Sequence, residues 1–163
     1  MSGGARINIR PAAIRDIPAV HRLLGQVLEI HAAIHPDIFI SGTRKYTDEE
    51  LREIFENDET PVFVAVDNVD LVKGYCFCIL QESKGTNCTY PQKTLYIDDL
   101  CVDETARGQH VGQALLTFVK AFAARVGCNR MTLNVWAGND SARAFYDAMG
   151  FAPQRTTMEL PLK

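Results

Sequence analysis

A short polar loop carries the residues best suited to bind an anion. Residues 95–102 are apolar and β-prone, residues 107–113 read Arg-Gly-Gln-His-Val-Gly-Gln, and a strongly periodic segment follows. The first turn of a helix leaves backbone N–H groups without partners, and the helix dipole favours negative charge there. Arg107 adds a guanidinium that pairs well with phosphate oxygens. This pattern predicts a site for a phosphorylated ligand and suits a pyrophosphate.

Two common phosphate-binding motifs do not match this loop. It lacks the Gly-Lys-Ser/Thr ending of a nucleoside-triphosphate loop, and it lacks a G-x-G-x-x-G sequence after a first strand. From the loop alone, an exposed turn with a solvated arginine remains an alternative. The expected donors are the backbone N–H groups of Gly108, Gln109, His110, Val111, Gly112 and Gln113.

Composition places the chain among ordinary globular proteins. It has 163 residues, which suits one domain, and its net charge of -3 argues against a general nucleic-acid binder. No apolar run approaches the roughly 20 residues needed to span a bilayer, and residues 1–6 lack the apolar core of a signal peptide. The five cysteines lie mostly in apolar runs, as reduced thiols do. We therefore expect a cytoplasmic protein without membrane or nucleic-acid partners.

The hydrophobic pattern alternates between strand and helix periods. Strands are expected at residues 7–10, 61–67, 71–81, 94–102, 130–136 and 156–160. Helices are expected from residue 16 to about 35, from a Thr47–Glu50 capping box to about 57, from 111 to 126, and from 139 to 150. This order predicts a mixed α/β sheet with helices on both faces.

Two motifs together resemble the GNAT superfamily of acyl-CoA N-acyltransferases. The pyrophosphate loop of that family reads Arg/Gln-x-x-Gly-x-Gly/Ala, and here it spans 107–112. The family's Asn-x-x-Ala-x-x-x-Tyr-x-x-x-Gly-Phe motif is matched from Asn139 to Phe151, with Ala142 and Tyr146 in place. The order of elements from residue 95 to 160 also fits, and the N-terminal half fits more loosely.

His110 stands where this family usually has the middle glycine of the loop. Contacts to the phosphates in such enzymes come mainly from backbone N–H groups, so a non-glycine residue fits if its φ is negative. The imidazole would then crowd the phosphate or, when charged, contact it.

The resemblance implies one GNAT-like domain over residues 1–163, with acetyl-CoA as cosubstrate and no metal. Its sheet should have six or seven strands, and strands 95–102 and 130–136 should be adjacent and splay apart to leave a cleft for the pantetheine arm. The backbone of Leu100, Cys101 and Val102 should line the path to the acetyl group, and the Leu100 N–H is the expected oxyanion donor.

Acyl transfer from a thioester to an amine requires a deprotonated amine and a proton for the leaving thiolate. Tyr146 is the candidate acid, because the resemblance puts the acid at this position; the alternative is a core tyrosine. By period two, Asp98 shares a strand face with Leu100 and Val102, and Asp99 faces the opposite way with a structural partner. Asp98 is therefore a candidate base or substrate anchor, with a structural role as the alternative.

Three further side chains have two interpretations each. Asn139 either binds the pantetheine arm or caps its helix. His31 and His35 are spaced four apart on a helix, as metal ligands can be, but no third ligand is evident and hydrogen bonding is favoured. Cys101 should point off the strand face that lines the cleft, which disfavours an acyl-cysteine intermediate.

The sequence therefore predicts an N-acetyltransferase in which an amine attacks acetyl-CoA directly within a ternary complex. The acceptor amine should lie against the first two helices and the loop 82–91. Expected acceptors, in falling order, are a small-molecule amine, a protein N-terminus and a lysine side chain.

The alternative functions are a non-catalytic acyl-CoA-binding sensor or interaction module, and a plain α/β domain whose helix binds another phosphate. A homodimer is compatible with the sequence, and exposed strand edges are where its interface would lie.

Overall fold

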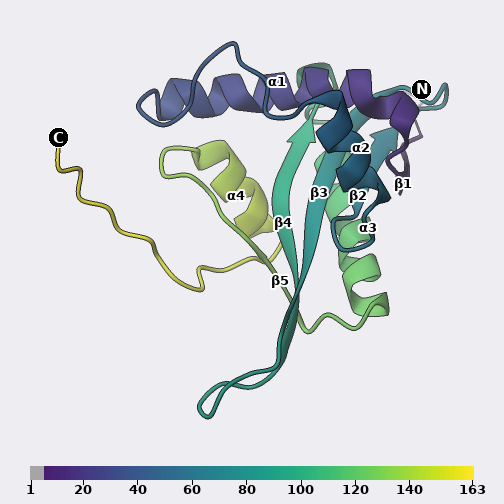
Figure 1. Ribbon diagram of the computed structural model, residues 1–163. Helices are drawn as coiled ribbons and strands as arrows, with labels where there is room; N and C mark the ends of the chain where they lie inside the picture. Colours follow the sequence, from purple (N-terminus) through teal and green to yellow (C-terminus); the bar gives the residue numbers. More distant parts are fainter. Residues whose placement is uncertain (1–5) are drawn as a thin grey trace.

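The computed structural model describes residues 6–163, so most of the N-terminal segment considered above lies outside it. One mixed sheet runs through the centre of the molecule, with helices on both faces (Figure 1). Its strands, in spatial as well as chain order, are β1 (Asn8–Pro11), β2 (Val62–Val66), β3 (Val72–Ser83), β4 (Gln92–Val102) and β5 (Arg130–Leu133). Neighbours from β1 to β4 are antiparallel, and β5 is parallel to β4. The predicted fold class is confirmed.

Two apolar cores lie on opposite faces of this sheet. The helices are α1 (Ile17–Ile34), α2 (Asp48–Glu56), α3 (Val111–Arg125) and α4 (Asp140–Ala148). Val62, Val64 and Val66 of β2 join the core beneath α1 and α2, while Phe63 and Ala65 join the core beneath α3. All five residues of β2 are buried, as expected for a strand covered on both faces. No helix within residues 6–163 is long and apolar enough to cross a membrane.

Strand β4 contains a bulge at Asp98. Phe77 of β3 pairs with Asp99, while its neighbour Cys78 pairs with Ile97, so Asp98 is the extra residue. The alternation of side chains shifts there, because Ile97 and Leu100 both contribute to the core beneath α3. The prediction that Asp98 shares a face with Leu100 and Val102 is therefore wrong, since it assumed an uninterrupted period of two.

The predicted splay of β4 and β5 is confirmed. Pairing between β4 and β5 covers only Thr94–Ile97 and Arg130–Leu133. Beyond the bulge at Asp98, residues 99–102 continue to pair with β3 but no longer with β5. The backbone on that side of β4 is therefore available to a ligand.

The strand count differs from the prediction of six or seven. The described residues form five strands, and the strand expected at 156–160 is absent. Residues 152–163 are all exposed and run away from the body of the molecule (Figure 1). A strand needs a neighbour for its backbone groups, and none lies beside this segment.

Buried Asp103 holds the turn between β4 and α3. Its carboxylate pairs with Arg22 of α1 and accepts hydrogen bonds from Thr105 N (3.0 Å) and Oγ1 (2.9 Å). Burial alone would raise the pKa of Asp103, but the bonds from Thr105 and Arg22 outweigh it and lower the pKa to about 2. The backbone N–H of Glu104 also donates to Gln26 of α1 at 3.1 Å. These contacts hold the turn that precedes the predicted phosphate loop against α1.

Two residues of the loop adopt the left-handed conformation. Gly108 has φ +75°, and His110 has φ 61° and ψ 19°. We expected a non-glycine residue at position 110 to have a negative φ, and the positive φ of His110 shows that this expectation is wrong. Histidine in this conformation costs roughly 1 kcal/mol relative to an ordinary backbone conformation. Although histidine replaces the glycine that is usual in this family, the backbone at position 110 keeps the conformation that glycine favours.

The Asp103 interactions predict an acid-dependent loss of stability. A folded pKa below the unfolded value of about 3.9 stabilises the protein above that pH, and this contribution disappears as the pH falls towards 2. Asp103→Asn should therefore cost about 2 kcal/mol of unfolding free energy at pH 7, and the difference from wild type should shrink near pH 3. Urea unfolding at both pH values measures it, with exposed Glu104→Gln as the control. An equal deficit at both pH values would contradict this assignment.

The conformation of His110 predicts opposite effects of two substitutions. His110→Gly should raise the unfolding free energy by up to about 1 kcal/mol, because glycine adopts positive φ without the steric cost. His110→Val should lower it, because a β-branched side chain tolerates this conformation poorly. Chemical denaturation of both variants provides the comparison, and a destabilised glycine variant would show that the imidazole makes a compensating contact.

Candidate active site

The two sequence motifs meet beside the point where β4 and β5 separate. Gly112 in the first turn of α3 lies so close to α4 that a Cβ there would be 3.2 Å from Cζ of Phe145. The same Cβ would lie 3.5 Å from a methyl group of Val102 at the end of β4. Glycine at 112 thus permits α3, α4 and β4 to come together. The structure therefore places the phosphate loop next to the helix that carries Tyr146.

The loop itself is open to a ligand. Residues 107–110 are exposed, and the His110 side chain does not cap α3, so it leaves the first-turn N–H groups free to meet an anion. Arg107 lines a groove between α1 and the loop, together with Gln26, Glu29, Ile30, Ala33 and Glu104. Arg107 and the exposed residues 108–110 thus lead directly into the first turn of α3, while the groove that Arg107 lines is formed with α1 and Glu104 rather than with residues 108–113.

Asn139 has a structural role at the start of α4. Its Oδ1 accepts a hydrogen bond from the backbone N–H of Ala142 at 3.3 Å. Asn139 therefore caps α4, which was one of its two predicted roles, and it pairs one of the free N–H groups of the first helical turn. Contact of Asn139 or Ala142 with a pantetheine arm stays a prediction.

Tyr146 of α4 is partly buried and packs against the core beneath α3. Its ring packs edge-on against Phe145 at 5.2 Å and Phe151 at 5.7 Å between centroids. Burial raises the pKa of the Tyr146 hydroxyl far above its ordinary value, and the charges of Cys76 and Asp99 raise it further. The hydroxyl therefore keeps its proton at neutral pH, as a hydrogen-bond donor or general acid must.

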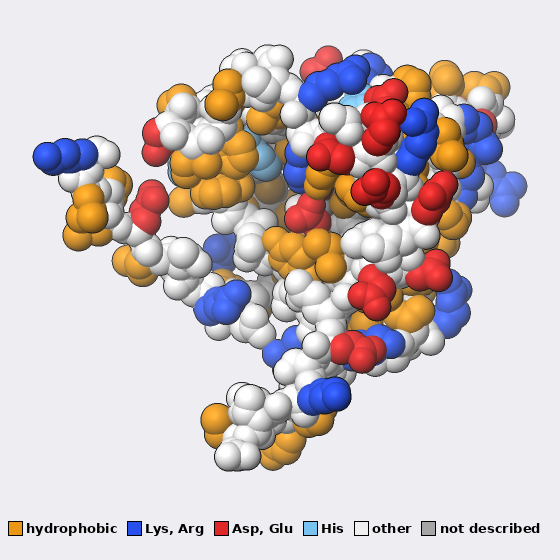
Figure 2. Space-filling view, in the orientation of Figure 1, with side chains coloured by type: hydrophobic (Ala, Val, Ile, Leu, Met, Phe, Trp, Pro, Cys, Tyr) orange, Lys and Arg blue, Asp and Glu red, His pale blue; other side chains and the backbone are white. Residues whose placement is uncertain are grey.

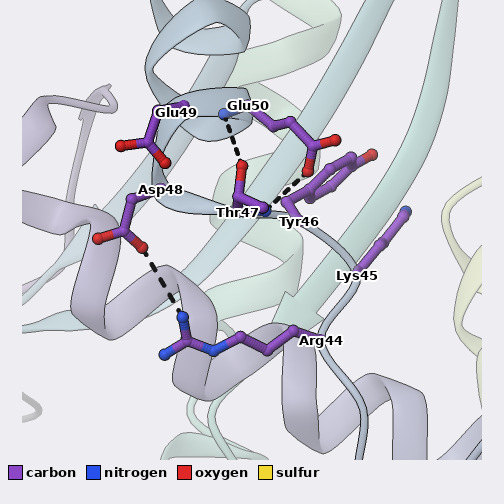
Figure 3. Close-up of a pocket in the computed structure, with 7 residues that line it drawn as sticks. All are labelled: Arg44, Lys45, Tyr46, Thr47, Asp48, Glu49 and Glu50. Carbon is purple, nitrogen blue, oxygen red and sulfur yellow. Dashed lines mark hydrogen bonds and ion pairs between the residues drawn. The ribbon is translucent and has the colours of Figure 1, made fainter.

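Both aspartates at the β4 bulge contact one ammonium group. Lys45 Nζ is 3.3 Å from Asp98 Oδ2 and 3.5 Å from Asp99 Oδ2. The prediction that Asp99 faces away from Asp98 is therefore wrong, and the bulge is the reason. Lys45 comes from the loop before α2 and extends away from the Thr47–Glu50 capping box (Figure 3). The capping box, which the sequence predicted, thus anchors the segment that carries this lysine.

The environment of this cluster shifts the pKa of two of its members. Burial is the main cause that raises the pKa of Asp99, whose side chain is only 10% exposed, and it exceeds the opposing effect of Lys45. Burial alone would lower the pKa of Lys45, but Asp99 and Asp98 outweigh it and raise that pKa. Lys45 therefore balances part of the negative charge of the two carboxylates.

Tyrosines from β3 and the α2 loop surround the aspartates. Tyr75 is fully buried, and its hydroxyl has no hydrogen-bond partner among residues 6–163. Burial and then the charge of Asp99 raise the pKa of Tyr75. Tyr46 stacks on Phe77 with centroids 6.0 Å apart. No local pattern predicts a role for Lys45 or Tyr75; the one signal in the sequence is a pair of adjacent aspartates inside an apolar strand.

Cys101 cannot readily act as a nucleophile. Its sulfur is buried and lies 3.6 Å from the carbonyl oxygen of Leu23 in α1. Burial, and then Asp99, raise the pKa of the Cys101 thiol to about 12. The thiol therefore stays protonated at neutral pH, in keeping with the expectation that no acyl-cysteine forms. All five cysteines are free.

An aromatic cluster joins the loop after α1 to the segment that follows β5. Phe39 lies 5.1 Å from His31 and 5.2 Å from Trp136, and His35 lies 5.2 Å from Trp136, between ring centroids. The Nε2 of His35 also hydrogen-bonds to the carbonyl of Ala137 at 2.8 Å. His31 and His35 thus serve packing and hydrogen bonding. Among the described residues, no three His, Cys, Asp or Glu side chains are grouped to hold a metal ion.

Known proteins with this fold include enzymes that transfer acetyl groups. The chain is 27% identical over 146 residues to YhfO, an uncharacterized N-acetyltransferase of Bacillus subtilis (strain 168), covering 89% of both chains. The crystal structure of a mutant BH1408 protein from Bacillus halodurans matches with a TM-score of 0.92 and 33% identity, covering 96% of this chain and 99% of that one. The aminoglycoside N-acetyltransferase AAC(6')-Iy, solved in complex with CoA, matches with a TM-score of 0.75 and 15% identity over 99% and 97% of the two chains, which shows a shared fold.

The family model covers most of the described chain and both motifs. Residues 25–151 match the acetyltransferase (GNAT) family, a range that includes the β4 bulge, the phosphate loop and Tyr146. The resemblance seen in the two motifs is thereby confirmed. The chain belongs to the acetyltransferase (GNAT) family.

Proposed function

We propose that this protein transfers an acetyl group from acetyl-CoA to a primary amine, by direct attack within a ternary complex. The observation that carries the proposal is the meeting of three features at the β4–β5 split. These are the open first turn of α3, the protonated Tyr146 and the carboxylate pair at the β4 bulge. CoA complexes of the same fold, such as that of AAC(6')-Iy, agree with this choice of cosubstrate.

The first part of the site would hold the cosubstrate. Arg107 and the N–H groups of residues 108–113 would bind the pyrophosphate, because Arg107 supplies a cation and the uncapped first turn of α3 supplies unpaired donors. Residues 98–102, which have lost β5 as a neighbour, would supply backbone groups to the pantetheine arm. Among these, the Leu100 N–H is the proposed donor to the developing oxyanion. Acetyl-CoA itself supplies an activated acyl group.

The second part of the site would hold the acceptor. Asp98 and Asp99 already bind one ammonium group, that of Lys45. A substrate ammonium would replace Lys45 there, and one of the two carboxylates, directly or through water, would accept its proton. Its raised pKa makes the Asp99 carboxylate a stronger base than an ordinary aspartate. A small cationic amine is therefore the preferred acceptor, ahead of a protein N-terminus and a lysine side chain.

Tyr146 would complete the reaction as the acid. Once the amine attacks, the C–S bond breaks and the thiolate needs a proton, which the Tyr146 hydroxyl supplies. The rival function, a non-catalytic acyl-CoA-binding module, would need the loop at 107–113 but neither Tyr146 nor the aspartates.

Substitution of Tyr146 separates these functions. Tyr146→Phe should lower kcat about 100-fold or more, as loss of a general acid does, and leave CoA affinity within about twofold. Thiol release with a panel of amines measures kcat, and calorimetry with CoA measures binding; exposed Tyr90→Phe is the control. Unchanged turnover would remove Tyr146 as the acid. Thiol release no faster than background hydrolysis with every amine would favour the binding module.

Removal of the Lys45 charge tests the acceptor site. Lys45→Met should lower KM for a cationic amine several-fold, because the substrate no longer competes with a built-in ammonium for Asp98 and Asp99. Lys45→Arg keeps the competing charge, and Lys120→Met changes an exposed lysine of α3. Steady-state kinetics with the best amine of the panel provide KM. A KM that rises in Lys45→Met would show that the lysine helps to bind the acceptor instead.

A further inference from the structure

Lys45 places a primary amine at the site proposed for the acceptor. Its Nζ lies 3.3 Å from Asp98 Oδ2 and 3.5 Å from Asp99 Oδ2, the two carboxylates assigned above to the substrate ammonium. Leu100, whose N–H is the proposed oxyanion donor, directly follows Asp99, and neighbouring Cα atoms are only about 3.8 Å apart. The chain itself therefore presents the chemical group that the proposed reaction acetylates.

The Lys45 side chain can leave the carboxylates while its backbone stays in place. The side chain is 40% exposed, and its four-carbon stem is flexible. On one side of Lys45, Glu29 of α1 accepts hydrogen bonds from Ser41 Oγ at 2.6 Å and from the Gly42 N–H at 2.7 Å. On the other side, the Thr47–Glu50 capping box fixes the start of α2 (Figure 3). The loop is thus anchored at both ends, and only the lysine side chain has to move.

We propose that the protein acetylates Lys45 in its own active site when acetyl-CoA is bound and no free amine is present. The reaction rests on the proposed function, because it uses the same acyl donor and the same carboxylates. The Lys45 nitrogen attacks the acetyl carbon, so that an N–C bond forms and the C–S bond breaks. The ammonium loses two protons: one passes through a carboxylate to water, and the other replaces the proton that Tyr146 gives to the departing thiolate. Each chain reacts once, because the acetylated lysine cannot leave as a product.

Chemical acetylation without the site would not select Lys45. Burial alone would lower the pKa of Lys45, but Asp99 and Asp98 outweigh it and raise that pKa, so the amine stays protonated and is a poor nucleophile. Acidic side chains gather over α2, next to the loop that carries Lys45, and they include those of residues 48–50 (Figure 2). Such a surface repels the phosphates of acetyl-CoA in solution. Preferential acetylation of Lys45 therefore requires the acyl donor to be bound in the site.

Other lysines of the chain provide internal references. Lys73 pairs with Asp67 at 3.4 Å and Lys93 with Glu82 at 3.3 Å, so each of these ammonium groups binds a carboxylate outside the bulge. Lys120 is exposed on α3. Its acetylation therefore reports the chemical reactivity of an accessible lysine in the same chain.

Mass spectrometry of the full chain, incubated with acetyl-CoA and no amine, tests the reaction. Wild type should gain one acetyl group that peptide mapping places on Lys45, about tenfold or more faster than Lys120 is acetylated, because the site holds the reactants together. Lys45→Arg should lose this fast reaction, and Lys120→Arg should keep it. Tyr146→Phe should slow it, as loss of the acid does. The rate per chain should not change when the protein is diluted.

Equal acetylation of Lys45 and Lys120 in the folded chain would overturn the proposal, since it would show ordinary chemical reactivity. A rate that falls on dilution would also overturn it, since one copy would then modify another. Thiol release with the amine panel, measured on the same sample, separates self-acetylation from the proposed function. A chain that acetylates free amines but not Lys45 contradicts self-acetylation alone, whereas a chain that acetylates neither contradicts both.

Discussion

Strand β4 keeps its pairing with β3 to the end but loses β5 after Ile97, and the active-site region depends on this single change in hydrogen bonding. Inside a sheet, every N–H and C=O group of a central strand is used by a neighbour. Residues 98–102 have one side of the backbone released from that requirement. The start of α3 meets α4 and the end of β4 at Gly112, so the loop at 107–112 and the helix that carries Tyr146 both lie close to the end of this strand. A ligand can therefore take the place of a strand.

The bulge at Asp98 adds a second function to the same strand. Regular alternation would send two adjacent side chains to opposite faces, whereas the extra residue allows Asp98 and Asp99 to meet one ammonium group. Burial of Asp99 is tolerated because Lys45 compensates its charge, and the same burial keeps its pKa raised. The two carboxylates thus pair with a lysine from a loop that the α2 capping box anchors.

Features set by nearby residues could be predicted from the sequence. The capping box at Thr47–Glu50, the apolar stripe of α3 and the β4–β5 splay follow from local pattern or from the matched motifs. Features set by a distant neighbour could not. The bulge depends on the register with β3, the φ of His110 depends on how the loop meets α3, and a strand at 156–160 needs an edge that the chain itself does not bring beside it. Lys45 reaches the aspartates across 53 positions in sequence, a contact that no local pattern reports.

The central claim is that the β4–β5 split holds the acyl donor between the α3 loop and Tyr146. A crystal structure of the protein with CoA measures this most directly. We expect the pyrophosphate on the N–H groups of residues 108–113, the pantetheine arm along residues 98–102, and the thiol next to the Tyr146 hydroxyl. CoA bound with its thiol away from Tyr146, or with its pyrophosphate away from this loop, would rule out this mode of binding.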